Sequence, residues 1–501
     1  MVGALDRLTA TWHLRRRAHR DDNRQLPDPS LPAGTDRLPE IRHIVLLMME
    51  NHSFDNYFGT LGHGEGFEPD TDGSPRAANS GTAGVVRAHH LDSTVQKPGV
   101  PTQSWHASHI QWDGGANDGF VKSIEETVPG GDPSVAMGYW TEGDLPFYAG
   151  LARTFALADH WYCSCLGPTF PNRRFLMAAT ANGLIDDVPL GMIDYPATGT
   201  IFDLLDRHRI SWINYHHVKS WHVVLTGAFR GGILRLLRSV GLALARAFPS
   251  LLKTAQGNIQ FTADLYPVGV WRRVRHLRNI DRFFKHAATG TLPAVSIVDP
   301  DFQACSEENP QDIQIGEGFA ASVVDAVLHG AGWKDTLLIW FYDEHGGYFD
   351  HAPPPPAAEP DDVLPRSLLS SGGPIRWLLE KLGVWKKLQA IDTGAGRYDR
   401  LGFRVPAVVV SPYAKPGYVS PTTYDHTSAL KLIETKWNLP PLTRRDAAAV
   451  DPLDMIDLAS PPPFLQPPVL PTPRKQWAET VPPFSRRVKL AQALGLVGRA
   501  R

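Results

Sequence analysis

Residues 338–356 read LIWFYDEHGGYFDHAPPPP, and this stretch decides the fold that we expect. Residues 337–341 are apolar throughout, which is typical of a strand buried on both faces of a parallel sheet. Ionisable residues follow at once, and open α/β sheets bind their ligands at the carboxyl ends of the strands. One acidic pair could simply cap a strand. Five ionisable groups in residues 343–351, around a glycine pair that allows a tight turn, favour half of an active site.

A second apolar run, residues 41–49 (IRHIVLLMM), is also followed by polar groups, beginning with Glu50 and Asn51. Two interpretations fit this segment: Asn51 and Ser53 cap the next helix while Asp55 braces the turn, or the polar residues belong to the same site as the first stretch. Parallel strands deliver their carboxyl ends to one edge of a sheet, so two such clusters favour a shared site.

Two further strand candidates lie within residues 294–301 and 405–410, and helical patterns lie between the apolar runs. Residues 146–158 are predicted to be helical, with a short strand or extended turn at 159–162, and a helix is predicted over 428–437. The expected fold class is therefore α/β, with a mostly parallel central sheet, helices on both faces and loop-rich insertions. The predicted layout has three parts: a polar N-terminal arm (1–38), one catalytic domain (39–450) and a proline-rich, basic C-terminal tail (451–501). The catalytic domain is expected to contain three insertions, at about 59–104, 225–260 and 357–395.

Composition limits the function classes. The 501 residues are 43% hydrophobic and 20% charged with a formal net charge of −2, so no global field favours nucleic acid. The three cysteines, Cys163, Cys165 and Cys305, are too few for a disulfide framework and are interpreted as packing residues.

Targeting features are weak. The triple arginine 15–17 is not followed by the apolar segment of an export signal, and no run of about 18 apolar residues predicts a membrane span. The expected location is the cytoplasm or a membrane periphery, with secretion as the alternative.

Residues 167–173 (GPTFPNR) open a helical segment, and their prolines restrict the backbone around Thr169. A hydroxyl at a helix N-terminus faces backbone N–H groups that stabilise an alkoxide or a phosphate oxygen. Arg173 would add a bidentate phosphate donor. The competing interpretation makes Thr169 an ordinary helix cap. His106 lies in an aromatic segment, 105–120, which could form a lid, and spacing alone favours a structural histidine there.

Four ordered motifs resemble the bacterial phosphoesterase family, which contains phosphatidylcholine-type phospholipases C and an acid phosphatase within the alkaline phosphatase superfamily. The motifs are ENHSFD (50–55), GPTFPNR (167–173), DEHGG with DH (343–351) and YDHTS (424–428). The resemblance covers about residues 40–190 and 290–445 and implies an alkaline phosphatase-like fold.

The resemblance implies Thr169 as the nucleophile, with a divalent metal held by Glu50, Asn51, Asp343 and Glu344. Histidines matching His106, His345 and His351 would contact or protonate the phosphate. His426 either reaches the phosphate or caps its helix. Asn51 is also expected to bind phosphate.

One departure from the family concerns Asn309, where relatives often carry a histidine before the proline. That difference puts substrate preference or catalytic efficiency in question. Glu308 and Asp312 are candidate carboxylates at the edge of the site.

The chemistry of these residues agrees with phosphoester cleavage, which needs a nucleophile, neutralised phosphoryl oxygens and an acid for the leaving group. Oxygen ligands favour Ca²⁺, Mg²⁺ or Mn²⁺, with Zn²⁺ as an alternative. The predicted function is a phospholipase C acting through a phosphothreonine. The alternatives are an acid phosphatase-type phosphomonoesterase and a weakened, phospholipid-binding relative.

The expected partner is a phospholipid or another phosphoester. Arginines recur along the apolar segment 225–252, which would either lie in a membrane interface or pack on the domain with its arginines reaching solvent.

Overall fold

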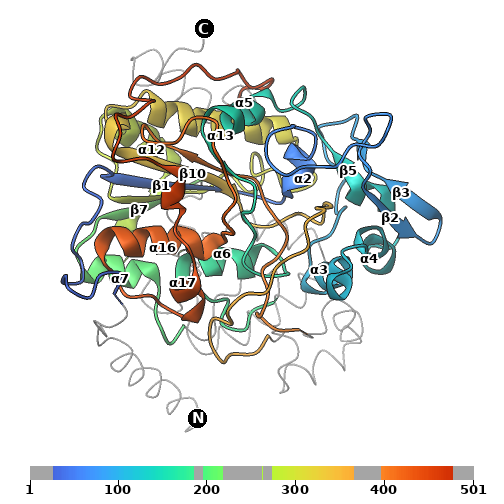
Figure 1. The fold of residues 1–501 in the computed structure, drawn as a ribbon, viewed down its shortest axis with the longest axis horizontal. Helices are drawn as coiled ribbons and strands as arrows, with labels where there is room; N and C mark the ends of the chain where they lie inside the picture. Colours follow the sequence, from blue (N-terminus) through green and yellow to red (C-terminus); the bar gives the residue numbers. More distant parts are fainter. Residues whose placement is uncertain (1–25, 186–195, 218–261, 263–272, 366–395, 478–501) are drawn as a thin grey trace.

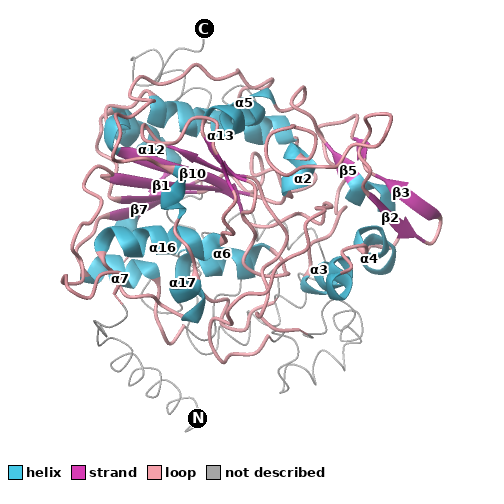
Figure 2. Cartoon of the chain, in the orientation of Figure 1, coloured by secondary structure: helices cyan, strands magenta, loops and turns pink. Residues whose placement is uncertain are grey.

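The computed structural model describes residues 26–185, 196–217, 262, 273–365 and 396–477. Their largest element is an eight-stranded sheet in the order β12-β6-β11-β10-β1-β9-β7-β8, with helices on both faces (Figures 1 and 2). The predicted α/β class with a mostly parallel central sheet is confirmed.

The two runs that began the sequence argument are neighbouring strands at the centre of this sheet. β1 (His43–Met49) and β10 (Thr336–Tyr342) pair in parallel from His43 opposite Thr336 to Met49 opposite Tyr342. Every residue of both strands is buried, as expected for strands covered on both faces. The pairing brings the carboxyl ends of the two strands to the same edge.

The other strands extend the sheet on both sides. β9 pairs in parallel with β1 and β7, β7 pairs in parallel with β8, and β11 runs antiparallel to both β10 and β6. The bounds are β6 (Ala156–Ala158), β7 (Trp212–His216), β8 (Leu277–Asn279), β9 (Val295–Val298), β11 (Ala407–Val410) and β12 (Val419–Ser420).

Helices cover the two faces in separate groups. In Figure 1, α5, α12 and α13 lie above the sheet, and α6, α7 and α16 lie below it. Their bounds are α5 (Pro146–Thr154), α6 (Thr169–Ala178), α7 (Ile201–Arg207), α12 (Ile280–Ala288), α13 (Ile313–Leu328), α16 (His426–Trp437) and, beside α16, α17 (Arg444–Ala448).

A smaller region adjoins the carboxyl edge of the sheet. It contains short helices and two-stranded ribbons, which are drawn to the right of the sheet in Figure 1. The bounds are α2 (Phe54–Phe58), β2 (Ala78–Gly81), β3 (Gly84–Arg87), β4 (His89–His90), α3 (Trp105–Trp112), α4 (Phe120–Thr127) and β5 (Gly138–Tyr139).

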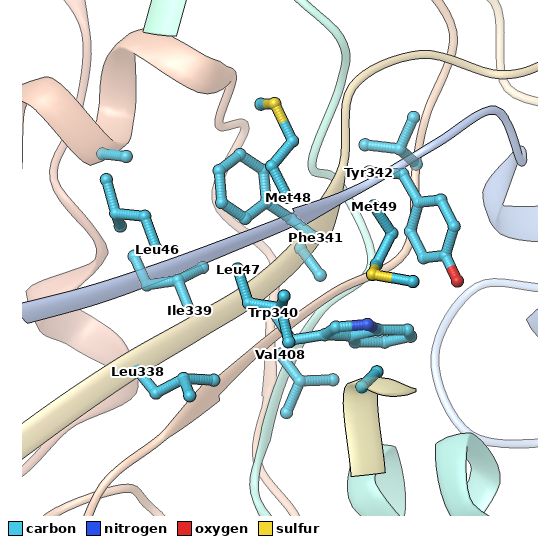
Figure 3. Close-up of a cluster of buried hydrophobic side chains, with 14 of the residues drawn as sticks. Leu46, Leu47, Met48, Met49, Leu338, Ile339, Trp340, Phe341, Tyr342 and Val408 are labelled. Carbon is cyan, nitrogen blue, oxygen red and sulfur yellow. The ribbon is translucent and has the colours of Figure 1, made fainter. Parts of the chain in front are cut away.

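The core is centred on β1, β10 and β11. Figure 3 shows side chains of these strands interleaving, including Leu46, Met48, Ile339, Phe341 and Val408. All five are at most 1% exposed. Burying such side chains contributes about 1.5–3 kcal/mol each to folding, so the strands that position the site are stabilised by the hydrophobic core.

Three predicted boundaries differ from the structure. The helix predicted over residues 146–158 ends at Thr154, because residues 156–158 pair as β6 with β11 and β12. Sheet pairing overrides the local helix preference of alanine and leucine here. α16 begins at His426 rather than at 428, and the apolar run 405–410 forms a strand only over Ala407–Val410.

Several predicted segments lie outside the described residues. They are residues 1–25 of the N-terminal arm, the amphipathic segment 225–252, most of the insertion at 357–395 and the end of the tail from 478. In the part of the chain that is described, no helix combines the length and hydropathy needed to cross a membrane. The three cysteines are buried and unbridged, as expected.

Candidate active site

The candidate site lies where β1 and β10 end. Met49 and Tyr342 lie at the same end of the two strands in Figure 3, so the next residues, Glu50 and Asp343, leave the sheet side by side. A backbone hydrogen bond from Asp343 N to the Met49 carbonyl, 3.2 Å long, continues the ladder past the last pair. The predicted convergence of the two polar clusters follows from this register.

Four side chains, which we call the oxygen cluster, meet beyond the strand ends: Asn51, Thr169, Asp343 and Glu344. The Thr169 hydroxyl lies 3.3 Å from the inner amide atom of Asn51, to which it donates when that atom is the oxygen. All four residues are at most 5% exposed. Three segments far apart in sequence therefore deliver oxygen atoms to one buried point.

The amide of Asn51 can take two orientations in this cluster. With its nitrogen inward, it donates to Glu344 Oε1 at 2.8 Å and Asp343 Oδ1 at 3.0 Å. With its oxygen inward, that oxygen and two carboxylate oxygens face one another. The second arrangement needs a cation between the oxygens, because facing acceptors repel. Asn51 also has a left-handed backbone, φ 75°, which asparagine tolerates better than most residues.

Arg173 lies beside the oxygen cluster among three carboxylates. Its guanidinium is 2.9 Å from Asp343, 3.2 Å from Asp299 and 3.6 Å from Glu50. It was predicted to bind phosphate. The structure shows it holding carboxylates at the strand ends, and contact with phosphate stays a prediction.

These carboxylates outnumber the local positive charge. Burial raises the pKa of Glu50 and of Asp343, and Arg173 opposes both shifts. Glu50 Oε2 is buried and has no hydrogen-bond partner among the described residues. Concentrated negative charge and an orphaned oxygen both carry a free-energy penalty that a bound cation would remove.

The residues present therefore fit a divalent cation. The donors are carboxylate and amide oxygens, the ligand type of hard ions, and the thiols of Cys163 and Cys165 are not among them. The candidate ligands are Asn51, Asp343 and Glu344, with Glu50 reaching the same region through Arg173.

Thr169 is the first residue of α6, and a side chain braces the loop before it. Asn172 donates to the carbonyls of Gly167 at 2.8 Å and Pro168 at 3.2 Å, and its oxygen accepts from Cys165 N at 3.0 Å. Pro168, at the N-cap, has no side-chain group that could satisfy the first helical N–H groups. The hydroxyl is thus held at a helix N-terminus, as the sequence predicted.

The glycine pair after His345 is required sterically. A Cβ on Gly346 would lie 1.9 Å from the carbonyl oxygen of Asn51, and one on Gly347 would lie 2.3 Å from that of Thr102. Both glycines have left-handed φ values of 68° and 84°. The turn therefore lets two ligand-bearing loops touch through their backbones.

His345 lies under the site rather than at its surface. Its Nε2 is 2.7 Å from Gln111 Oε1 on α3, and its ring contacts Phe403 at 4.5 Å between centroids. Burial lowers its pKa to about 3, so it is neutral at ordinary pH. A direct role of His345 in proton transfer stays a prediction.

His426 is enclosed as well. Its Nε2 lies 2.7 Å from the Asp343 carbonyl, and its Nδ1 lies 3.4 Å from Trp161 Nε1. Burial lowers its pKa to about 4. The N-cap of α16 is Asp425, so the interpretation of His426 as the helix cap is wrong. Phosphate contact by His426 stays a prediction.

His106 lies on α3, and two glutamines in or next to this helix contact residues of the site. Gln103, just before α3, can donate to Asn51 at 3.2 Å, and Gln111 holds His345. His106 itself is partly exposed on this helix. Its predicted contact with phosphate stays a prediction.

A second group of charged residues, which we call the arginine cluster, combines three residues that follow the same strands with an arginine that precedes β11: Asp55, Asp350, His351 and Arg404. Ligand atoms of Asp55, Asp350 and His351 lie within 4.8 Å of one another, close enough to hold a metal ion. However, the Arg404 guanidinium already lies 3.0 Å from Asp55 and 2.8 Å from Asp350. We therefore favour the oxygen cluster as the cation site.

His351 is the charged edge of the arginine cluster. Its Nδ1 is 2.6 Å from Asp55 Oδ2. Burial alone would lower its pKa, but the hydrogen bond and attraction to Asp55, with help from Asp350, raise it to about 9. His351 is thus an imidazolium at neutral pH, with its side chain 27% exposed.

The segment containing the family departure borders the site. Ser306 accepts a backbone hydrogen bond of 3.0 Å from Glu50 N, and Asn309 Oδ1 accepts one of 2.8 Å from Gly99 N. Asp312 caps α13 and pairs with Lys475, and Glu308 raises the pKa of Glu50. Asn309 is thus tied to the loop before α3.

Sequence reasoning missed two residues that organise the site. Asp299 follows β9, which adjoins β1, so the rule that found Glu50 could also have found it. Arg404 had no such indicator. It is fully buried, and only the fold reveals its two carboxylate partners.

Comparison with known proteins agrees with this geometry. Residues 41–440 match the phosphoesterase family. Phospholipase C B of Mycobacterium tuberculosis is 32% identical, over 85% of this chain and 79% of its own length. Hemolytic phospholipase C of Pseudomonas aeruginosa is 29% identical over 82% of this chain and 54% of its own length. Non-specific phospholipase C1 of Arabidopsis thaliana is 28% identical over 82% of this chain and 69% of its own length.

The match spans both halves of the site, from the strand before Glu50 to the helix that contains His426. The family resemblance predicted from the four motifs is confirmed. The oxygen cluster, the hydroxyl at the start of α6 and this match lead to one conclusion: the chain belongs to the phosphoesterase family and is a phosphoric ester hydrolase.

Proposed function

We propose that the chain is a metal-dependent phospholipase C that cleaves phospholipids through a phosphorylated Thr169. The observation that carries the proposal is the oxygen cluster, in which the Thr169 hydroxyl lies 3.3 Å from Asn51 and shares its buried point with two carboxylates. The phospholipid class of substrate is supported by relatives named phospholipase C at about 30% identity.

The residues divide the reaction between them. The Thr169 hydroxyl releases its proton to solvent, and its Oγ1 forms a bond to phosphorus while the bond from phosphorus to the glycerol oxygen breaks. Water then hydrolyses the phosphothreonine, which releases the phosphorylated headgroup and restores the hydroxyl. Asn51, Asp343 and Glu344, with Glu50 nearby, would hold a divalent cation, which supplies charge neutralisation for the phosphoryl oxygens. The N-terminus of α6 orients the hydroxyl.

The leaving alkoxide needs a proton. We assign it to His351, the partly exposed histidine for which the family resemblance implies this role; Asp55 and Asp350 raise its pKa to about 9, so it carries a proton at neutral pH. A group that stays protonated at the working pH can act as an acid throughout the neutral range.

Replacement of the nucleophile tests the covalent route. Thr169→Ala should lower turnover of p-nitrophenyl phosphorylcholine by about 10⁴-fold or more, as expected when a nucleophile is removed. Thr169→Ser retains the hydroxyl and serves as the matched control, with activity within about tenfold of the wild type. An alanine variant with full activity rules out the phosphothreonine.

The choice of substrate separates the two enzyme classes. A phospholipase C should turn over p-nitrophenyl phosphorylcholine faster than p-nitrophenyl phosphate, and the reverse preference would indicate a phosphomonoesterase. Binding of phospholipid vesicles without turnover of either compound would indicate the non-catalytic relative.

A further inference from the structure

We propose that His426 is a positioning residue: it fixes the backbone of Asp343 relative to the segment that leads to Thr169. The inference rests on the proposed function, because it concerns how the same site is held together. It is argued from three sets of contacts around the first turn of α16.

The first set defines the tautomer of His426. A carbonyl oxygen can only accept, so the 2.7 Å contact with the Asp343 carbonyl places the proton on Nε2. An indole nitrogen can only donate, so Trp161 Nε1, at 3.4 Å, faces the lone pair on Nδ1. Both polar atoms of this fully buried ring are thereby used by the protein.

The second set attaches the start of α16 to the segment before Thr169. Asp425, the N-cap, accepts a 2.8 Å hydrogen bond from the Ser164 hydroxyl. Tyr424 and Trp161 form a parallel bridge, with Tyr162 N donating to the Tyr424 carbonyl at 2.9 Å. Helix α16 therefore holds residues 161–164, a few positions before the nucleophile.

The third set shows what depends on Asp343. Its Oδ2 accepts from Arg173 at 2.9 Å, and its Oδ1 lies 3.0 Å from the Asn51 amide. A backbone shift at Asp343 would move both carboxylate oxygens. The His426 ring therefore contacts both the segment before Thr169, through Trp161, and the candidate metal ligand Asp343. Both of its nitrogens are used in these contacts, so neither is available to bind substrate.

The test uses the full chain and two readouts, the affinity for Mn²⁺ and the kinetics with p-nitrophenyl phosphorylcholine. His426→Leu removes the donor to Asp343 and should weaken Mn²⁺ binding by about 10–100-fold, the usual effect of removing a residue that supports a metal ligand. kcat should fall by a similar factor, and KM should stay within about twofold.

His426→Gln is the matched control, because its amide nitrogen can reach the position of Nε2 and donate to the same carbonyl. It should restore Mn²⁺ affinity and kcat to within about threefold of the wild type, whereas His426→Asn, whose amide stops short, should not. Trp161→Phe keeps an aromatic ring, removes the donor to Nδ1, and should produce a smaller change in the same direction. Melting curves confirm folding in each case.

The outcomes separate this inference from the proposed function. A wild type that binds Mn²⁺ but turns over no phosphoester contradicts the proposed function and leaves the Mn²⁺ comparison to decide the role of His426. Unchanged Mn²⁺ affinity and kcat in folded His426→Leu overturn the inference. A raised KM with unchanged kcat in both the leucine and the glutamine variants also overturns it and assigns His426 to substrate binding.

Discussion

The oxygen cluster and the arginine cluster are built from the same two strand-end segments, yet they balance charge differently. Each has two fully buried carboxylates: Asp343 and Glu344 in the oxygen cluster, and Asp55 and Asp350 in the arginine cluster. In the arginine cluster, Arg404 lies within 3.0 Å of both Asp55 and Asp350, and His351 adds a second positive charge. In the oxygen cluster, Arg173 serves Asp343 while also contacting Asp299 and Glu50.

The difference indicates which cluster would hold the divalent cation that we propose. A buried carboxylate pair that contacts a guanidinium of its own is already compensated in charge, and removing either partner leaves an uncompensated buried charge. Under the proposed metal-dependent function, a group of buried carboxylates with a single shared arginine would be completed by a further cation. The ion pairs of Arg404 should therefore control mainly stability, and the candidate ligands of the oxygen cluster should control mainly activity.

Chelation should have the largest effect on the oxygen cluster. Prolonged EDTA treatment should abolish turnover of p-nitrophenyl phosphorylcholine and lower the melting temperature, because ligand binding to the folded state is lost. Adding back Ca²⁺, Mg²⁺, Mn²⁺ or Zn²⁺ separately should identify the ion that restores both. Full activity in the metal-free protein would contradict the comparison.

Asp343→Asn should nearly match the effect of chelation while leaving the fold intact. We expect kcat/KM to fall by roughly 10³-fold, about 4 kcal/mol, because a candidate metal ligand is lost. Melting temperature without metal should stay the same or rise, since one of several crowded carboxylates becomes neutral. Metal should no longer raise it. A strong loss of stability in metal-free protein would show that Asp343 acts as a structural ion pair.

Arg404→Leu should have the opposite profile. Breaking a buried ion pair costs about 3–5 kcal/mol, and Asp55 and Asp350 would be left facing each other. Denaturant unfolding measures the loss, and Arg397→Leu, at a solvent-exposed pair with Glu359, is the control and should change stability far less. Equal effects from the two variants would refute the structural role of the arginine cluster.

His351→Gln should have the smallest effect on stability, and that effect should depend on pH. The pKa of His351 is raised to about 9 in the folded chain, from an ordinary 6.5. Its contribution to stability, about 1–3 kcal/mol for a charged hydrogen bond, is therefore fully present below pH 6.5 and disappears as pH rises through 9. The melting temperatures of wild type and variant should differ at pH 6 and converge above pH 9. A constant difference across this range would mean that His351 is neutral in the fold.

Much of the site followed from the sequence because strand ends are easy to recognise. The apolar runs that became β1 and β10 are followed directly by Glu50 and Asp343, and parallel pairing was enough to expect them at one edge. The position of Thr169 at the start of α6 followed from the local proline pattern. Residues whose role depends on contacts across the fold were harder to predict. Arg404, Gln103 and Gln111 carry no pattern of their own.

The sequence by itself determined the α/β class, the two central strands, the polar residues that leave them and the family. Periodicity and chain-local motifs encode these features, so they can be recognised without the fold. Only the tertiary structure decided that Arg404 neutralises one carboxylate pair while the other pair meets Asn51 and Thr169. Charge compensation is a property of distances between side chains remote in sequence, and those distances exist only once the chain is packed.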